Sequence, residues 1–390
     1  MSGTILDDLK IIDTDSHWSE PYDLWTSRAP AKYRDRVPRM ETRGGKRRWW
    51  FDDAIPIGLP IASSVVDPAG EKVTGTVFFD FDNEMVHRAS YDAEARVEML
   101  DQLGLEAQIM YPNVAGFGNQ NFLKSPDDAL RLISVEIYND ALAEFQAASG
   151  QRVFGMALLP WWDLDAAVRE IERCHANGLR GIVTCSNPEE AGLPDMATPH
   201  WDPVWQVCSD LAMPVNFHIG SSKGNLDYYG KAPWPSFGLE RQLAVGSANL
   251  FMGNARVVGN MIYSGVPERF PALKFVSVES GVGWLPFFLE VLDHQMHETA
   301  PNELAELSML PSDYFRRQFY GCFWFERSTV RPTLEYVGAQ SLMFETDFPH
   351  PTCLYPRDDH DLAKALEGIP RDDVECIMSL NAAELYRIDI

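Results

Sequence analysis

Residues Ile11–His17 read IIDTDSH, a short apolar start that runs into alternating polar residues. In an extended strand every second side chain faces the same way, so Asp13, Asp15 and His17 are expected on one face. A carboxylate and an imidazole two residues apart can bind one ion together. The same residues can instead form a turn in which the two aspartates accept backbone hydrogen bonds, and this stretch alone favours neither interpretation.

Seven later stretches have a similar build and are separated by helix-like segments such as Ala93–Leu103 and Leu285–Glu298. Alternating strands and helices predict parallel β–α–β units, and eight such units close into a barrel without edge strands. An open doubly wound sheet is the alternative, but its GxGxxG sequence is absent after the first strand. The predicted strands are 9–15, 107–112, 153–159, 181–184, 214–218, 275–279, 319–325 and 342–347. We therefore predict an α/β fold, one (β/α)8 TIM barrel over residues 1–390.

Two segments depart from this pattern. Residues 18–90 are rich in Pro, Gly, Arg and Trp and contain strand-like pieces such as Thr76–Phe79, and residues 220–238 are rich in Gly, Lys, Tyr and Pro. Both follow the carboxyl end of a predicted strand, where barrel enzymes build their sites. Long loops in compact domains are usually lids or binding loops. We interpret 18–90 as an insertion that, with 220–238, encloses a substrate.

Composition narrows the class of protein. The 390 residues include 33 Lys and Arg against 57 Asp and Glu, a net charge of −24, which argues against binding to nucleic acid. The start MSGTILDDLK lacks the pattern of a signal peptide, and no apolar run approaches the roughly 18 residues of a membrane span. Six scattered cysteines without a CxxC pair indicate reduced thiols. We expect a cytoplasmic enzyme that acts on a small molecule and binds no membrane.

Three further strand ends carry residues suited to chemistry. His218 ends the fifth strand in PVNFHIG, and Asp347 ends the eighth in MFETDFPHP. In a closed barrel these ends meet that of the first strand at one mouth, and mixed Asp and His ligands suit zinc or manganese. A lone histidine is more often a core residue, but three such strand ends favour a metal site. Glu279 ends the sixth strand, either as an exposed rim residue or as a proton shuttle.

Four segments together resemble the amidohydrolase-related family of metal-dependent barrel enzymes, which includes aminocarboxymuconate semialdehyde decarboxylase and γ-resorcylate decarboxylase. The resemblance covers nearly the whole chain, with residues 18–90 the least matched, and it implies a distorted (β/α)8 barrel with one divalent metal ion. The segments are DTDSHWSEP (Asp13–Pro21), HWDPVWQVCSDLAMPVNFHIG (His200–Gly220), VESGVGWLP (Val278–Pro286) and ETDFPHP (Glu345–Pro351).

The resemblance also implies roles for single residues. The family's metal ligands match Asp15 and His17 on the first strand, His218 on the fifth and Asp347 on the eighth, and zinc is expected before manganese. The decarboxylases keep a catalytic histidine where this chain has Glu279. For this reason we place a metal-dependent hydrolase first, in which Asp347 activates water and Glu279 carries the proton.

Two other functions stay open. The first is non-oxidative decarboxylation of an aromatic or muconate-type acid, and the second is a barrel that only binds. The candidate substrate-binding residues are His350, Lys223 and Trp18. His350 can equally cap the proline turn, and Lys223 can equally be a solvated loop residue. The family resemblance and the many aromatic residues also predict a homodimer.

Overall fold

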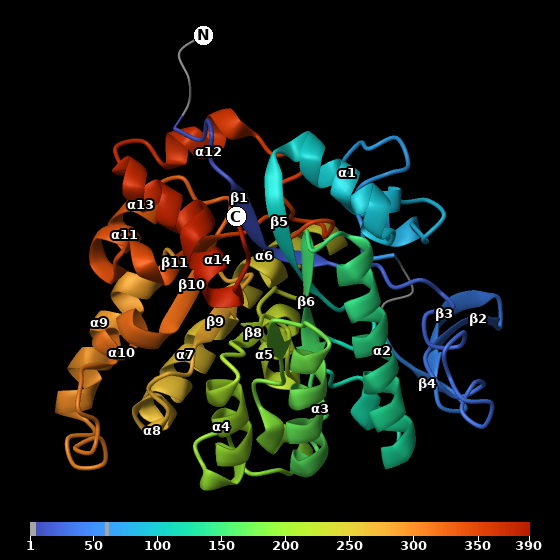
Figure 1. Cartoon of the computed structure of the whole chain (residues 1–390), viewed down its shortest axis with the longest axis horizontal. Helices are drawn as coiled ribbons and strands as arrows, with labels where there is room; N and C mark the ends of the chain where they lie inside the picture. The colour runs from blue at the N-terminus through green and yellow to red at the C-terminus, as the bar shows by residue number, and fades with distance from the viewer. Residues whose placement is uncertain (1–4, 59–61) are drawn as a thin grey trace.

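The computed structural model describes residues 5–58 and 62–390. Eight parallel strands follow one another around a sheet in chain order, as Figure 1 shows. Almost every residue in them is buried, which is typical of parallel strands covered on both faces. The strands are β1 (Ile11–His17), β5 (Leu105–Tyr111), β6 (Val153–Leu158), β7 (Gly181–Val183), β8 (Val215–His218), β9 (Phe275–Val278), β10 (Phe319–Phe323) and β11 (Leu342–Phe344). All eight predicted strands are confirmed, with bounds shifted by a few residues.

The sheet nearly closes into a barrel at the junction of β1 and β11. The Oγ1 hydroxyl of Thr14 donates to the carbonyl oxygen of Phe344 at 2.8 Å. The backbone N–H of Asp347 donates to the carbonyl oxygen of Asp15 at 2.9 Å, and that of His17 donates to Phe348 at 2.6 Å. The predicted (β/α)8 barrel is therefore confirmed, and its closure brings the first and eighth strand ends together.

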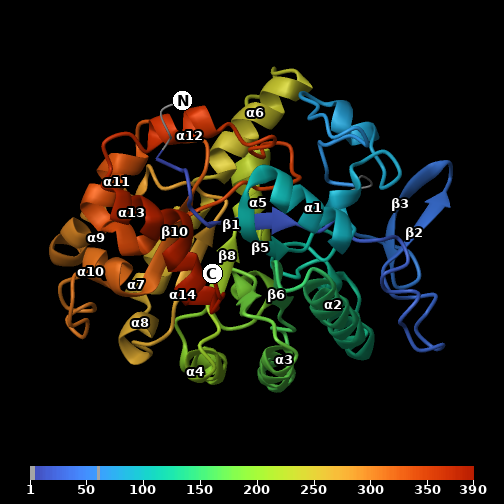
Figure 2. The ribbon, with the colours of Figure 1, turned by 45° about the horizontal axis from the view of Figure 1, so that its top comes forward.

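Helices cover the outside of the barrel (Figures 1 and 2). Asp92, Asp127 and Asp163 begin α1, α2 and α3, because each side chain accepts a hydrogen bond from a backbone N–H of the first turn. No helix in the described residues is long and apolar enough to cross a membrane. The outer helices are α1 (Ala93–Leu103), α2 (Asp128–Ala148), α3 (Leu164–Ala176), α4 (Asp202–Asp210), α7 (Gly253–Tyr263), α8 (Val266–Arg269), α9 (Leu285–Glu298), α10 (Pro311–Gln318), α11 (Val330–Val337), α12 (Asp359–Ala365), α13 (Arg371–Glu375) and α14 (Asn381–Tyr386).

The segment after β1 contains a small antiparallel sheet that stands beside α2 at the side of the barrel (Figures 1 and 2). Its strands are β2 (Arg39–Arg43), β3 (Lys46–Phe51) and β4 (Ile55–Pro56). Trp49 and Phe51 are buried, with Trp49 against Trp25 and Phe51 against Phe122. The strand expected at Thr76–Phe79 is wrong, because Val77–Asp80 forms a 3-10 helix after Gly75, which has a positive φ of 73°.

The loop expected at 220–238 is wrong over residues 223–231, which are helical, whereas residues 232–238 join two helices without regular structure. Helix α5 (Lys223–Lys231) begins at Ser222, whose Oγ accepts from the N–H of Asn225 at 3.0 Å, and α6 (Leu239–Leu250) follows it. The backbone N–H of Gly224, in the first turn of α5, donates to Oε1 of Glu190 at 2.8 Å. Gly224 and Gly230, two of the four glycines that suggested a loop, are thus helical residues, and the chain builds a helical wall after β8.

Candidate metal centre

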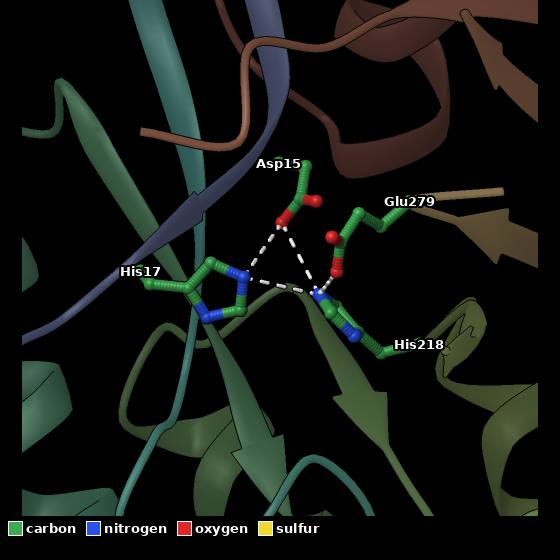
Figure 3. Close-up of side chains that lie close together, drawn as sticks. All are labelled: Asp15, His17, His218 and Glu279. Carbon is green, nitrogen blue, oxygen red and sulfur yellow. Dashed lines mark hydrogen bonds and ion pairs between the residues drawn. The ribbon is translucent and has the colours of Figure 1, made fainter. Parts of the chain in front are cut away.

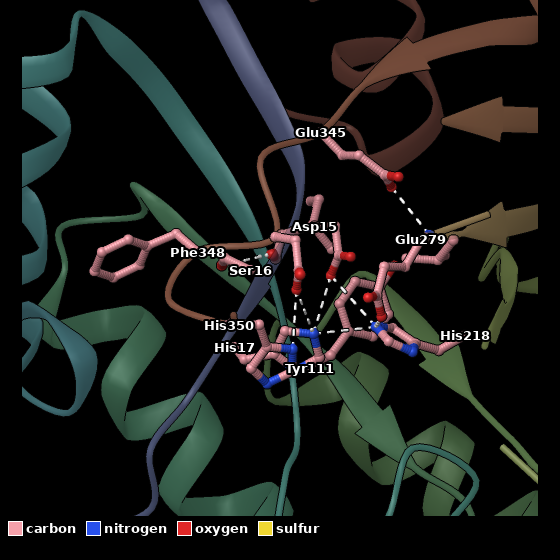
Figure 4. Close-up of polar contacts among 12 residues, drawn as sticks. Asp15, Ser16, His17, Tyr111, His218, Glu279, Glu345, Phe348 and His350 are labelled. Carbon is pink, nitrogen blue, oxygen red and sulfur yellow. Dashed lines mark hydrogen bonds and ion pairs between the residues drawn. The ribbon is translucent and has the colours of Figure 1, made fainter. Parts of the chain in front are cut away.

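Five side chains from four strand ends converge at the mouth of the barrel. Figures 3 and 4 show Asp15, His17, His218 and Glu279 directed toward one another. Asp15 and His17 come from β1 and His218 from the end of β8, while Glu279 directly follows β9 and Asp347 lies beyond β11. Glu279 and Asp347 both have left-handed backbone, with φ of 54° and 61°. Such backbone is rare for residues other than glycine, and it marks a position that the surrounding structure imposes.

The nitrogen and oxygen atoms of this cluster lie within a few ångströms of one another. The Nε2 atoms of His17 and His218 are 3.1 Å apart. Nε2 of His17 lies 3.4 Å from Oδ1 of Asp15 and 3.4 Å from Oδ1 of Asp347. Nε2 of His218 lies 3.6 Å from Oδ1 of Asp15 and 3.5 Å from Oε2 of Glu279. The first, fifth, sixth and eighth strand ends are therefore brought together as the sequence predicts.

The hydrogen bonds of the two histidines show which ring atoms face the centre. Nδ1 of His17 lies 3.2 Å from the carbonyl oxygen of Pro112, and Nδ1 of His218 lies 2.8 Å from that of Ile219. A carbonyl oxygen only accepts, so each Nδ1 carries the hydrogen and each neutral ring presents its Nε2 lone pair to the centre. Two lone pairs 3.1 Å apart repel each other unless a cation or a proton lies between them.

The donor set fits one divalent metal ion. Both carboxylate oxygens of Asp15 are buried without a hydrogen-bond partner in the described part of the chain. Such atoms are costly to bury unless a cation binds them. Imidazole nitrogens and carboxylate oxygens directed at one point are the ligands of zinc and manganese sites. Asp15, His17 and His218 thus form a coherent site, with Asp347 and Glu279 next to it.

Burial dominates the electrostatics of the cluster. It raises the pKa of Glu279 to about 8 and raises the pKa of Asp347 well above its usual range, where repulsion from Glu279 and Asp15 adds to it. Burial also lowers the pKa of His17. Burial lowers the pKa of His218 too, but attraction to Asp15 and Glu279 outweighs it and the pKa rises. A cation in the centre would reverse these directions for the carboxyl groups.

Glu279 is not the exposed rim residue that was one of its two interpretations. Its side chain is only 9% exposed, and its backbone N–H donates to Oε2 of Glu345 at 3.1 Å. The carboxyl group of Glu345 lies behind it, and burial raises that pKa well above the usual range. Glu279 therefore belongs to the buried cluster.

Asp13 does not join the cluster, so the expectation that it shares a face with Asp15 and His17 is wrong. Its carboxylate accepts from the N–H of Thr346 at 2.7 Å and from Nε2 of Gln108 at 2.7 Å. The pairing of β1 with β5 shifts register between Asp13 and Ser16, which breaks the simple alternation of side chains. Asp13 instead ties the end of β1 to the segment after β11.

Arg96 is a supporting residue that the sequence did not mark. It lies on α1 and is completely buried, and its guanidinium donates to the carbonyl oxygen of His17 at 2.8 Å and to Oε1 of Gln108 at 3.1 Å. Burial lowers its pKa to about 9, an effect that the carboxylate of Asp13 partly offsets. In the sequence Arg96 is one of several charged residues of an amphipathic helix, so no signal separates it from the exposed ones.

Replacing Arg96 by Met is expected to lower the free energy of unfolding by about 3–5 kcal/mol, because it leaves buried polar groups without their partner. Arg88→Met is the matched control, since Arg88 is exposed and forms a surface ion pair with Asp92. Denaturant unfolding of both variants measures the effect. Equal stability of the two variants would show that Arg96 does not hold the end of β1.

Of the three predicted substrate-binding residues, two line a cavity and the third, Trp18, is buried elsewhere. His350 and Lys223 both line a cavity of about 1470 Å3, which lies next to the cluster because His350 contacts both Asp347 and His17. Nε2 of His350 lies 2.7 Å from Oδ1 of Asn113, its Nδ1 lies 2.9 Å from Oδ1 of Asp347, and its ring stacks on His17. Lys223 is exposed at the start of α5.

Trp18 lies elsewhere. Its ring packs against Tyr138 and Phe145, its Nε1 donates to the carbonyl oxygen of Tyr91 at 3.2 Å, and it is not part of the cavity wall. The reason is alternation, because the side chain after the ligand at the strand end points away from the barrel mouth. We therefore do not retain Trp18 as a substrate-binding residue.

The family model for amidohydrolases matches residues 12–388, and the chain belongs to this family. A γ-resorcylate decarboxylase from Rhodococcus jostii is 25% identical over 352 residues, which cover 86% of this chain and 98% of that protein. The predicted family resemblance is thereby confirmed.

Two solved structures share the fold. An amidohydrolase from Mycobacterium avium subsp. paratuberculosis superposes with a TM-score of 0.76 at 21% identity, covering 97% of this chain and 99% of that one. A dihydroxybenzoic acid decarboxylase from Polaromonas sp., solved with bound manganese and the inhibitor 2-nitroresorcinol, gives a TM-score of 0.58 at 20% identity, covering 97% of both chains. These likenesses establish the fold of the whole chain.

Proposed function

We propose that this amidohydrolase is a metal-dependent, non-oxidative decarboxylase of an aromatic acid. The observation that carries the proposal is a cluster of two histidines and buried carboxyl groups under an apolar cavity. The relatedness to a γ-resorcylate decarboxylase over most of the chain supports it. Hydrolysis, which the sequence analysis placed first, has no such support among these relatives.

Asp15, His17, His218 and Asp347 would hold one divalent ion. The ion would supply Lewis acidity for binding a carboxylate and a neighbouring hydroxyl group of the substrate. Carboxylate oxygens suit manganese as well as zinc. A dihydroxybenzoic acid decarboxylase of the same fold binds manganese. We therefore place manganese before zinc for this site, which reverses the order expected from the sequence.

Glu279 would supply the proton. In decarboxylation the bond between the ring carbon and the carboxylate breaks, its electron pair stays on the ring carbon, and a proton joins that carbon as carbon dioxide leaves. Glu279 is buried beside the centre, with Oε2 3.5 Å from Nε2 of His218, so its carboxyl group is placed to carry a proton to a substrate bound there. When it carries a proton, this carboxyl group is neutral and does not repel an anionic substrate.

His350 and Lys223 would serve the substrate from the cavity wall. His350 is held between Asn113 and Asp347, so its position next to the cluster is defined. Lys223 offers an ammonium group to an anionic part of the substrate. The homodimer expected from the sequence stays a prediction, which light scattering of the purified chain tests.

His17→Ala and His218→Ala are each expected to lower metal affinity at least about 10- to 100-fold while the barrel stays folded, because the ligands stand at strand ends and not in the apolar core. Metal content after gel filtration, with circular dichroism on the same samples, measures this. His294→Ala is the matched control, because His294 is exposed on α9 and should leave the metal content unchanged. Full metal occupancy in both ligand variants would refute the site.

A further inference from the structure

The cavity over the cluster is much larger than one aromatic ring requires. Its volume is about 1470 Å3, whereas pockets that enclose drug-sized ligands measure roughly 300–1,000 Å3. A single-ring acid bound at the cluster would leave most of this space to water. The volume of the cavity therefore indicates a substrate larger than a single aromatic ring.

Large apolar side chains stand exposed on the wall of this cavity. Phe79 is 38% exposed, Leu226 is 45% exposed, Met252 is 44% exposed and Phe325 is 50% exposed, and all four line the cavity. They come from four separate segments of the chain, so local sequence does not explain their gathering. Exposed apolar surface gathered in one concave place marks a site that an apolar ligand covers.

Several polar side chains on the wall are engaged with the protein itself. Oε1 of Gln120 accepts from the N–H of Gly118, and its Nε2 donates to the carbonyl oxygen of Gly220, both at 2.9 Å. Nδ2 of Asn121 donates to the carbonyl oxygen of Val114, and Oγ of Ser222 donates to Asn187. These groups already form hydrogen bonds within the protein, so they do not require a polar ligand in this part of the cavity.

The segment after β1 and helix α6 both contribute to the wall of this cavity. A Cβ on Gly75 would lie 3.4 Å from Oε1 of Glu240, so the segment after β1 meets the start of α6. Figure 2 shows α6 next to this segment above the mouth of the barrel. Trp49 and Phe78 from that segment and Leu243 from α6 line the same cavity. The cavity wall thus extends from His350, next to the cluster, to a junction of two segments outside the eight strands of the barrel.

We infer that the substrate is an aromatic acid that carries a bulky apolar group, such as a second ring, on the side of the ring away from its carboxylate. The acid end meets the cluster, and the apolar group covers the exposed side chains of the wall. This inference rests on the proposed decarboxylation for the chemistry at the acid end. The size and apolar character of the substrate follow from the cavity alone.

A matched pair of acids tests the inference with the manganese-loaded full chain. The acids are 2,6-dihydroxybenzoate and 2,6-dihydroxy-4-phenylbenzoate, which share the reacting end and differ by one phenyl ring. Burial of the added ring is expected to raise kcat/KM at least about 10-fold, the effect of covering one large apolar group. An equal or lower kcat/KM for the phenyl acid, with the small acid decarboxylated, would overturn the inference and leave the proposed function standing.

Binding separates the two claims if neither acid is decarboxylated. Isothermal titration calorimetry of the manganese-loaded chain then measures both dissociation constants. Absence of turnover would count against the proposed function, whereas a dissociation constant at least about 10-fold lower for the phenyl acid would support the inferred substrate class. Equal dissociation constants for the two acids would overturn the inference.

A substitution that fills part of the cavity tests where the added phenyl ring binds. Ala244 lies on the face of α6 that lines the cavity, together with Leu243 and Ser247. Ala244→Trp should bring the preference for the phenyl acid close to one. Asn249→Trp is the control on the same helix, because Asn249 is outside the cavity wall and donates to the carbonyl oxygen of Val245. The preference should survive in the control, and its survival in Ala244→Trp would contradict the proposed placement of the apolar group.

Discussion

Glu279→Gln is expected to lower kcat about 10²- to 10⁴-fold while the metal content stays that of the unaltered chain. Gln keeps nearly the shape of Glu and can still accept hydrogen bonds, but it has no carboxyl proton to give to the ring carbon. Loss of one positioned acid or base typically costs a factor of this size. Metal stoichiometry and turnover on the same preparations measure both quantities.

The position of Glu279 would also allow it to ligate the metal, and the same variant distinguishes the two roles. Oε2 of Glu279 is 3.5 Å from Nε2 of His218, so the carboxyl group is near enough to the centre to ligate an ion. Loss of the metal from Glu279→Gln would show that Glu279 is a ligand. Turnover at the unaltered rate would show that the proton comes from another group.

Asp347→Asn is expected to lose both metal and activity, with affinity for manganese lowered at least about 100-fold. An amide is a weaker ligand than a carboxylate, and Asp347 is in contact with both His17 and His350 through Oδ1. Titration of metal into the metal-free variant measures the affinity. Glu345→Gln is the control, because Glu345 is buried beside Glu279 but bonds to its backbone N–H instead of facing the centre.

Asp347→Asn with unchanged manganese affinity would contradict the ligand set. In that case Asp15, His17, His218 and Glu279 would remain as the four donors, since their atoms also lie close enough to hold one ion. The two variants together therefore distinguish the ligand from the proton donor.

The barrel could be predicted from the sequence because each of its strands is a short buried run with its own boundary. The residues at the strand ends could be predicted too, since closure of a barrel brings such ends to one mouth. His218 and Asp347 are far apart in the chain, yet both contact His17 or Asp15 as expected from this rule. These features follow from periodicity and topology.

Features that depend on tertiary packing could not be predicted in this way. The burial of Arg96 and the turning of Asp13 toward Thr346 arise from the register of β1 against β5, which no local pattern encodes. Gly224 resembled a loop residue, although it lies within α5. For the same reason, the sequence did not predict helices α5 and α6, which line the cavity after β8.

Tracing the carboxylate carbon tests the central claim most directly. The manganese-loaded chain is incubated in D₂O with the two dihydroxybenzoates, each labelled with ¹³C in the carboxylate, and the products are followed by NMR and mass spectrometry. Decarboxylation predicts one ¹³CO₂ for each molecule of phenol formed and one solvent deuterium on the vacated ring carbon. If a fully metal-loaded protein releases no ¹³CO₂ from either acid, the account of this site as a decarboxylase centre is contradicted.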